Sequence, residues 1–117
     1  MNDVARQQLL RLIGLGVRAR GAVVGVQQVR QAAKRGDLAF AVIAPDASAN
    51  SLDKLVTLLR ARRIRFADLV SATELGAAVG RESTAAVGIV DRQLAKGIRE
   101  IVESSDSEVA EPDRGSV

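Results

Sequence analysis

The chain has 117 residues and a mass of 12.3 kDa, which is enough for one hydrophobic core but not for two. The sequence contains 47% apolar and 26% charged residues but no Cys, His, Trp or Tyr. Disulfides, thiolate metal sites and histidine-dependent catalysis are therefore excluded, while carboxylate and amine chemistry stays open. We expect a binding protein rather than an enzyme, with no catalytic residue, no metal and no cofactor.

The formal charge of +3 is unevenly distributed along the chain. Residues 103–117 carry five carboxylates and one arginine, a net charge of −4, which leaves +7 for residues 1–102. We predict a basic folded domain over residues 1–102 and an acidic, disordered tail over residues 103–117. A basic domain suits a polyanion such as nucleic acid, although a solvated basic surface explains the charge equally well.

Two further absences concern location. No window of about 18 uninterrupted apolar residues occurs, so the sequence predicts no membrane span and no membrane partner. The first residues lack the basic and apolar segments of a signal peptide. We therefore expect a cytoplasmic protein.

Helical and strand patterns alternate along the chain. In order, we expect a helix from Asn2 or Asp3 to about Gly21, a strand at 22–24, a helix between Gly25 and Gly36, a strand at 38–44, a helix from Asn50 to about Arg60, a strand from Ile64, a helix from Ser71 to Gly80, a strand at 85–90 and a helix from Asp91 to Val102. The alternation predicts an α/β protein, specifically a three-layer α/β/α sandwich around a mixed sheet of about four strands.

Local signals set several of these boundaries. Ser71 and Glu74 form an S-x-x-E capping box, which places a helix start at Ser71. Asn50 and Asp53 have the same spacing and predict the start of the third helix. The run at 38–44 is continuously apolar, which is typical of a strand buried on both faces.

Two candidate motifs have simpler explanations. Gly14, Gly16 and Gly21 superficially resemble a nucleotide-binding loop, but they follow a predicted helix instead of a strand, so we interpret them as helix-terminating glycines. Asp46 follows a buried strand, where α/β proteins often place ligands. A turn formed with Pro45 accounts for this aspartate equally well.

The segment that begins at Gly25 carries the best binding signal. Glycine allows a ligand to approach the backbone closely, and the N–H groups at a helix start can hold phosphate oxygens. Gln27 and Gln28 lie in the first turn, with Gln31 one turn further on. Carboxamides present both a donor and an acceptor to base edges, although a solvated helix face is the simpler explanation for any single glutamine.

Several stretches together resemble a known family. Their order and spacing fit from about residue 5 to residue 102, and the matching ranges are 25–36, 38–48, 64–66, 74–80 and 87–91. On these motifs the chain resembles the ribosomal-protein superfamily of L7Ae/L30e type, and within it a bacterial ribosomal-protein-like member. The resemblance implies an α/β/α sandwich that binds RNA kink-turns, which are sharply bent duplexes with tandem sheared G·A pairs.

The resemblance also implies a site. The family carries x-Asn-Glu-x-x-Lys after the glycine and Arg-Gly at the helix end, and this chain has Gln27, Gln28 and Gln31 at the first three of these positions. A neutral glutamine accepts a weaker hydrogen bond than a glutamate does. The RNA-binding candidates are Gly25, Gln27, Gln28, Arg30, Gln31, Lys34 and Arg35, with Arg81, Ser83 and Thr84 in a nearby loop.

We therefore hypothesise a non-enzymatic, ribosomal-protein-like RNA-binding protein with altered kink-turn specificity. Its expected partner is structured RNA, with ribosomal RNA among the candidates, and an association with the ribosome or the translation machinery follows from the resemblance. Two alternatives stay open: a protein-interaction adaptor of the same fold, and an accessory factor in ribosome function, translation or RNA modification.

Overall fold

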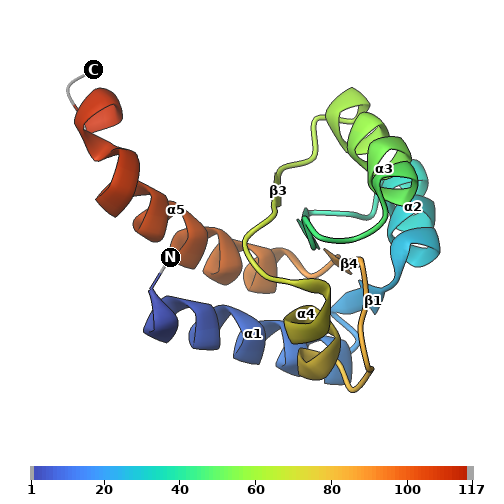
Figure 1. The fold of residues 1–117 in the computed structure, drawn as a ribbon. Helices are drawn as coiled ribbons and strands as arrows, with labels where there is room; N and C mark the ends of the chain where they lie inside the picture. The colour runs from blue at the N-terminus through green and yellow to red at the C-terminus, as the bar shows by residue number, and fades with distance from the viewer. Residues whose placement is uncertain (1, 116–117) are drawn as a thin grey trace.

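The computed structural model describes the backbone of residues 2–115 and the side chains of residues 2–104. Within this range the chain forms helices and strands in strict alternation (Figure 1). Their bounds are α1 Asp3–Arg18, β1 Ala22–Val24, α2 Val26–Arg35, β2 Phe40–Ile43, α3 Ala49–Ala61, β3 Phe66–Ala67, α4 Ala72–Ala78, β4 Ala86–Ile89 and α5 Arg92–Gly115.

The strands form one mixed sheet in the order β1-β4-β2-β3. Strand β4 runs antiparallel to both of its neighbours, whereas β2 and β3 are parallel. Strands β1, β2 and β3 therefore point the same way, and each of them is followed by a helix. We call the side of the sheet where these three strands end, and where β4 begins, the carboxyl edge.

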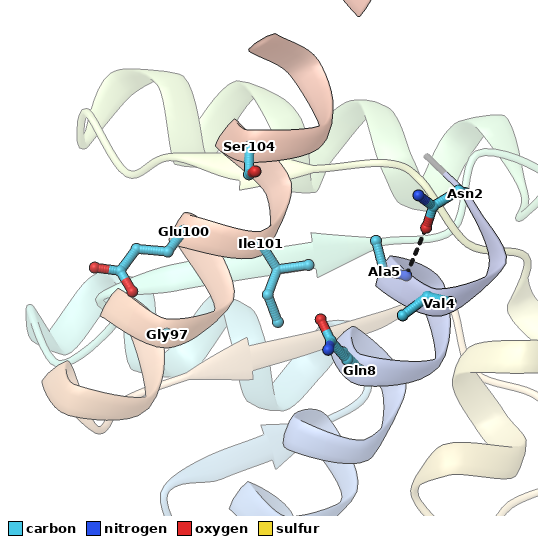
Figure 2. A pocket seen from close by; sticks show the side chains of 8 residues that line it. All are labelled: Asn2, Val4, Ala5, Gln8, Gly97, Glu100, Ile101 and Ser104. Atoms are coloured by element: carbon cyan, nitrogen blue, oxygen red, sulfur yellow. Dashed lines mark hydrogen bonds between the residues drawn. The ribbon is translucent and has the colours of Figure 1, made fainter. Parts of the chain in front are cut away.

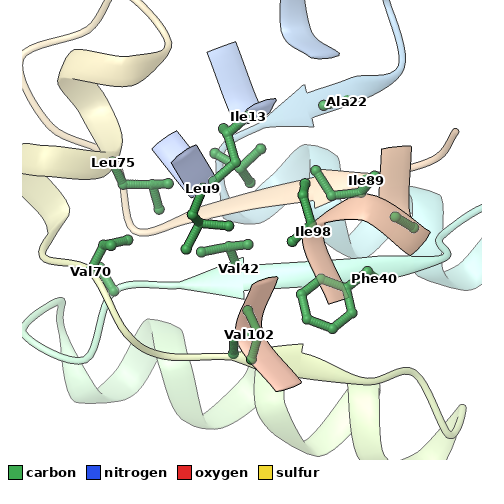
Figure 3. Close-up of a cluster of buried hydrophobic side chains, with 14 residues drawn as sticks. Leu9, Ile13, Ala22, Phe40, Val42, Val70, Leu75, Ile89, Ile98 and Val102 are labelled. Atoms are coloured by element: carbon green, nitrogen blue, oxygen red, sulfur yellow. The ribbon is translucent and has the colours of Figure 1, made fainter. Parts of the chain in front are cut away.

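The helices cover both faces of the sheet, which confirms the predicted three-layer α/β/α sandwich. Along β2 the side chains alternate between two apolar cores. Phe40 and Val42 pack with α1, α4 and α5 in the core that Figure 3 shows. Ala41 and Ile43 face α2 and α3 on the other side. The strand is thus buried on both faces, as its unbroken apolar run predicts.

Predicted helix starts are confirmed at three places. The Asn2 side chain accepts a hydrogen bond from the N–H of Ala5 at 2.8 Å, which caps α1. Ser71 and Glu74 form the complete capping box of α4. The carboxylate of Asp91 accepts from the N–H of Leu94 at 3.0 Å in the first turn of α5.

The prediction for the start of α3 is wrong. The helix begins at Ala49 with Ser48 as its N-cap, and Asn50 lies inside the first turn. The N–H of Ala47 bonds to the carbonyl of Ala44, which closes the turn after β2. The N–H of Leu52 bonds to the carbonyl of Ser48, so the N-cap lies two residues before the predicted cap at Asn50. Asn50 and Asp53 therefore do not act as a capping pair.

Two other boundaries differ from prediction. Strand β2 is shorter than the apolar run at 38–44, because its partner β4 offers only four paired residues. Helix α5 continues to Gly115, into the acidic segment 103–117 that we expected to be disordered. Side chains beyond Ser104 lie outside the described residues, so the separation of that segment from the folded domain stays a prediction. None of the described helices combines the length and apolar character needed to cross a bilayer.

Candidate functional site

The carboxyl edge places the start of α2 beside the loop that leads into β4. Val24 at the end of β1 pairs with Val87 of β4. One residue further on, the N–H of Gly25 donates to the carbonyl of Ala86 at 2.8 Å. The same carbonyl, at the first residue of β4, accepts a hydrogen bond from the hydroxyl of Thr84 at 3.3 Å, so the start of α2 and the end of the loop at 81–84 meet at Ala86.

Gly25 is required for its backbone conformation. Its φ of 99° and ψ of 149° lie in a region that only glycine adopts without strain. A Cβ at this position would meet no atom within 4 Å, so the space next to it is open. The chain thus turns sharply from β1 into α2 and leaves its backbone accessible to a ligand.

Helix α2 presents polar and basic groups without a single carboxylate. Gln27, Gln28 and Gln31 are all exposed. The N-cap, Gly25, offers no side-chain acceptor to the first N–H groups of the helix. These N–H groups carry the positive end of the helix dipole, and together with the carboxamides they suit an anionic, hydrogen-bonding ligand.

Lys34 and Arg35 lie at the other end of α2. With a rise of about 1.5 Å per residue, they are roughly 10 Å from Gln28 along the helix axis. Arg35 is paired with Asp37 through Nε and Oδ2 at 3.1 Å. The structure therefore separates these two predicted residues from the group at the helix start, and only the first turns of α2 adjoin the loop.

The loop at 81–84 is exposed at Arg81 and Ser83 but buried at Thr84, which is 9% accessible. The hydroxyl of Thr84 donates to the carbonyl of Ala86 at 3.3 Å, and its N–H donates to the carbonyl of Ala72 at 3.0 Å. Thr84 thus holds the loop in place, and it presents neither its hydroxyl nor its N–H to solvent.

Gly76 of α4 lets this loop pack closely. A Cβ at this position would lie 2.6 Å from the backbone nitrogen of Ser83 and would also clash with its Cα. Because backbone atoms cannot move aside as a flexible side chain does, any larger residue must displace the loop. The position of Ser83 in the site therefore depends on a glycine in a different element.

Asp46 has a structural role at the same edge. Its Oδ1 accepts a hydrogen bond from the N–H of Ala72 at 2.9 Å, which ties the turn after β2 to the start of α4. Because the donor lies 26 residues further along the chain, this contact is a long-range one that the local turn interpretation does not include. The described residues also contain no group of three or more carboxylates placed to hold a metal ion.

Helix α3 adds residues that the sequence analysis did not select. Asn50, Ser51 and Lys54 line a pocket together with Gln27 and Arg30 of α2. The assignment of Asn50 as a helix cap obscured its place on this face. The spacing of Asn50 and Lys54, four residues apart on a helix, is the signal that could have identified them.

A second pocket lies in the other helical layer, between α1 and α5. Figure 2 shows its lining, which includes Asn2 at the N-cap of α1, Gln8 from α1 and Glu100, Ile101 and Ser104 from α5. Its lining contains one carboxylate and no basic side chain. This chemistry does not suit an anionic ligand, so the polar face of α2 is the better candidate site.

Comparison with known proteins shows the family. Residues 7–99 match the ribosomal protein L7Ae/L30e/S12e/Gadd45 family. The chain belongs to this family. The matched region of this L7Ae-family chain includes both α2 and the loop at 81–84.

Two solved structures resemble this L7Ae-family chain. A protein of unknown function from Bacillus halodurans is 24% identical, with a TM-score of 0.76, over 81% of this chain and 96% of its own. A 15.5kD RNA binding protein from Giardia lamblia is 21% identical, also with a TM-score of 0.76, over 93% of both chains. These likenesses show the fold, and a search of curated proteins found no match.

Proposed function

We propose that this L7Ae-family chain is a non-enzymatic RNA-binding protein that recognises structured RNA through the start of α2 and the loop at 81–84. One observation carries the proposal: the carbonyl of Ala86 accepts hydrogen bonds from Gly25, at an uncapped and carboxylate-free helix start, and from Thr84, at the end of the loop. The resemblance of the folded chain to an RNA binding protein from Giardia lamblia supports the same assignment.

The proposed contacts divide into two kinds. The N–H groups at the start of α2 and the guanidinium of Arg81 bind phosphates, which position the RNA without reading its sequence. The exposed carboxamides of Gln27 and Gln28 bind base edges, because each supplies a donor and an acceptor. No proton transfer is required, which fits a chain with neither histidine nor cysteine.

We infer that kink-turn recognition is retained in altered form. A glutamine at position 28 accepts through a neutral oxygen, and its hydrogen bond to a guanine edge is weaker than that of a charged glutamate. Gln31 likewise replaces a family lysine and removes one positive charge from the surface. The consequence is lower discrimination for the tandem G·A pairs than the family pattern implies.

We also propose that the protein is cytoplasmic and associates with the ribosome or the translation machinery. In that setting it would meet structured RNA, including ribosomal RNA. The family also admits a protein-interaction adaptor and an RNA-modification accessory factor. Copurification distinguishes RNA binding from these alternatives. Copurified nucleic acid that ribonuclease removes supports RNA binding, whereas a stoichiometric protein partner without RNA supports the adaptor.

The decisive measurement compares two RNAs. Binding is measured by fluorescence anisotropy to a kink-turn RNA and to a control whose G·A pairs are disrupted. We expect Gln28→Ala to reduce the affinity ratio between the two RNAs roughly threefold, which corresponds to one neutral hydrogen bond, and Gln28→Glu to increase it. The matched control is Gln93→Ala, which removes an exposed glutamine from α5 and should change nothing.

Two results would contradict this proposal. Equal binding of both RNAs by the unmodified protein would exclude kink-turn recognition while leaving general RNA binding intact. No binding to any structured RNA at low salt would exclude RNA binding altogether, because the electrostatic contribution is largest there.

A further inference from the structure

The edge of the sheet opposite the candidate site carries a concentration of cations. We call it the amino edge, because β1, β2 and β3 begin there and β4 ends there. Helices α1, α2 and α3 also end at this edge, and α5 begins there. Six exposed cationic side chains lie at these helix ends, and they are Arg20, Lys34, Arg35, Arg62, Arg63 and Arg92.

Backbone contacts bring one half of this surface together. The carbonyl of Gly21, which follows Arg20, accepts a hydrogen bond from the N–H of Asp91 at 3.1 Å. Arg92 comes directly after Asp91, so the backbones of the two arginines lie close to each other. Arg92 in turn lines a pocket of about 360 Å³ together with Arg35 from the end of α2.

The other half of the surface joins the ends of α2 and α3, which run side by side (Figure 1). Nη1 of Arg62 donates a hydrogen bond to the carbonyl of Lys34 at 3.3 Å, and Arg63 follows directly. These cations flank all four strands in the order β1-β4-β2-β3. At about 4.8 Å per strand, the surface is therefore about 14 Å wide.

Two of the arginines have backbone conformations that folding alone does not favour. Arg20 has a φ of 64° and Arg63 a φ of 58°, and no other non-glycine residue in the described part of the chain has a positive φ. Each follows the C-cap of a helix, where glycine is the usual residue. Gly36, with a φ of 81°, fills the left-handed position at the end of α2.

Helix dipoles do not account for these two arginines. A cation stabilises a helix end from the last turn, and α1 and α3 already have Arg18 and Arg60 there. Arg20 and Arg63 also take part in none of the ion pairs between described residues. A strained residue whose exposed side chain forms no ion pair within the protein indicates a role toward a partner.

The charges of the amino edge suit a phosphate backbone. Five of the six cations are arginines, whose planar fork can bind a phosphate through two hydrogen bonds. The carboxylates nearby are engaged within the chain: Asp37 pairs with Arg35 at 3.1 Å, and Asp91 accepts from the N–H of Leu94. They therefore leave most of the positive charge available to a polyanion.

Other partners suit this surface less well. The large apolar side chains exposed among the described residues are Val4 and Leu15, which both belong to α1, so the surface lacks the apolar centre of a protein interface. It also offers no exposed ring on which the bases of a single strand could stack, because Phe40 is buried and Phe66 is half-buried. A duplex, whose phosphates face outward, needs neither feature.

We propose that the amino edge binds the phosphate backbone of a second RNA duplex, so that the protein holds two RNA segments together. The bridging rests on the proposed function, whereas duplex binding at this edge does not. Helix α2 starts at the candidate site and ends at the amino edge, about 15 Å away for its 10 residues. Lys34 and Arg35, which this helix separates from the candidate site, belong to the second surface.

The first experiment measures binding of the full chain to a plain RNA duplex without a kink-turn, by fluorescence anisotropy over a range of salt concentrations. We expect the double variant Arg20→Gly and Arg63→Gly to bind about tenfold more weakly, because charged contacts are lost. Its salt slope should fall by roughly 1.8, at about 0.9 for each phosphate contact. The midpoint of its thermal unfolding should rise, because glycine relieves the positive φ at both positions.

Opposite changes in affinity and stability would exclude misfolding as the cause of the weaker binding. The matched control is the double variant Arg11→Gln and Lys54→Gln, which removes two exposed cations away from the amino edge. Its duplex affinity should stay within about twofold of that of the unmodified protein. Unchanged affinity in the glycine variant, or an equal loss in the control, would overturn the inference. Displacement of the duplex by polyglutamate at equal charge would assign the surface to an acidic protein instead.

The second experiment tests the bridging with two labelled RNAs, a kink-turn RNA and a plain duplex, whose proximity is measured by energy transfer. We expect transfer only when the full chain is present, and the glycine variant should lose it while still binding the kink-turn RNA. If the duplex binds at the amino edge and the kink-turn RNA does not bind at all, the proposed function fails and the second surface remains. If the two RNAs displace each other from the unmodified protein, they share one site and the inference is wrong.

Discussion

Helices α2 and α4 both begin at the carboxyl edge, but only α4 has side chains that cap the N–H groups of its first turn. The start of α4 is closed by its own chain: Ser71 and Glu74 form a capping box, and the Asp46 carboxylate accepts from the N–H of Ala72. The start of α2 has only Gly25, which offers no side-chain acceptor. At one edge of one sheet, therefore, one helix start is internally satisfied and another is open.

The difference shows where binding can occur. N–H groups that already have partners within the protein contribute to stability and have nothing left for a ligand. N–H groups without partners contribute less to stability and attract anions. The N–H of Thr84 donates to the carbonyl of Ala72 at the capped start of α4. The capped helix start thus holds the loop at 81–84 in place.

The strongest test of this dependence is Gly76→Ala. The new Cβ would lie 2.6 Å from the backbone nitrogen of Ser83 and must displace the loop. We expect a loss of about 2 kcal/mol in the free energy of unfolding, as for overpacked sites, measured by chemical denaturation. RNA affinity should fall as well, although no residue of α2 has changed.

The matched control for that substitution is Gly97→Ala in α5. Its Cβ would meet only Cδ1 of Leu12 at 3.7 Å, an ordinary contact. Because alanine favours a helix by up to about 1 kcal/mol over glycine, the stability should be unchanged or higher. Unaltered stability and RNA affinity in Gly76→Ala would show that α4 does not hold the loop.

The sequence predicted the features that depend on neighbouring residues. The glycines at 25 and 36 bracket α2 because a positive φ is a property of the residue itself. The capping box at Ser71 is likewise local, since both partners lie within one turn. The open helix start was predictable for the same reason, although its proposed role in RNA binding stays a prediction.

A direct measure of the difference between open and capped starts is the pair Ser71→Ala and Ser48→Ala. Ser71 accepts a hydrogen bond from the N–H of Glu74 at 3.1 Å, and its loss should cost about 1 kcal/mol of stability. Ser48 makes no such bond at the start of α3, so its replacement should cost less than about 0.5 kcal/mol. Thermal unfolding of both variants provides the comparison, and equal losses would refute the distinction.

The features that the sequence did not reveal depend on contacts between distant segments. The start of α3 is set by the turn after β2, whose Ala44 is fixed by a hydrogen bond to Ala85. The local pattern at Asn50 and Asp53 could not reveal this constraint. The pocket beside Arg30 is formed by side chains from two helices, and only the packing of α2 against α3 brings Lys54 to it.

The smallest expected effect concerns pH. The backbone N–H of Ser71, as the main cause, together with the Ser71 hydroxyl and the Arg6 guanidinium, lowers the pKa of Glu74 below its ordinary value of 4.5, although burial partly opposes them. The folded chain therefore favours the carboxylate, and this contribution to stability is present above pH 4.5 and is lost as the pH falls below it. Glu74→Gln should flatten the stability profile in this acidic range. Denaturation midpoints across that range measure the difference; since Glu74 is partly exposed, the effect should also shrink at high salt. A profile that keeps its slope in Glu74→Gln would mean that the capped start of α4 gains nothing from the charge of its glutamate.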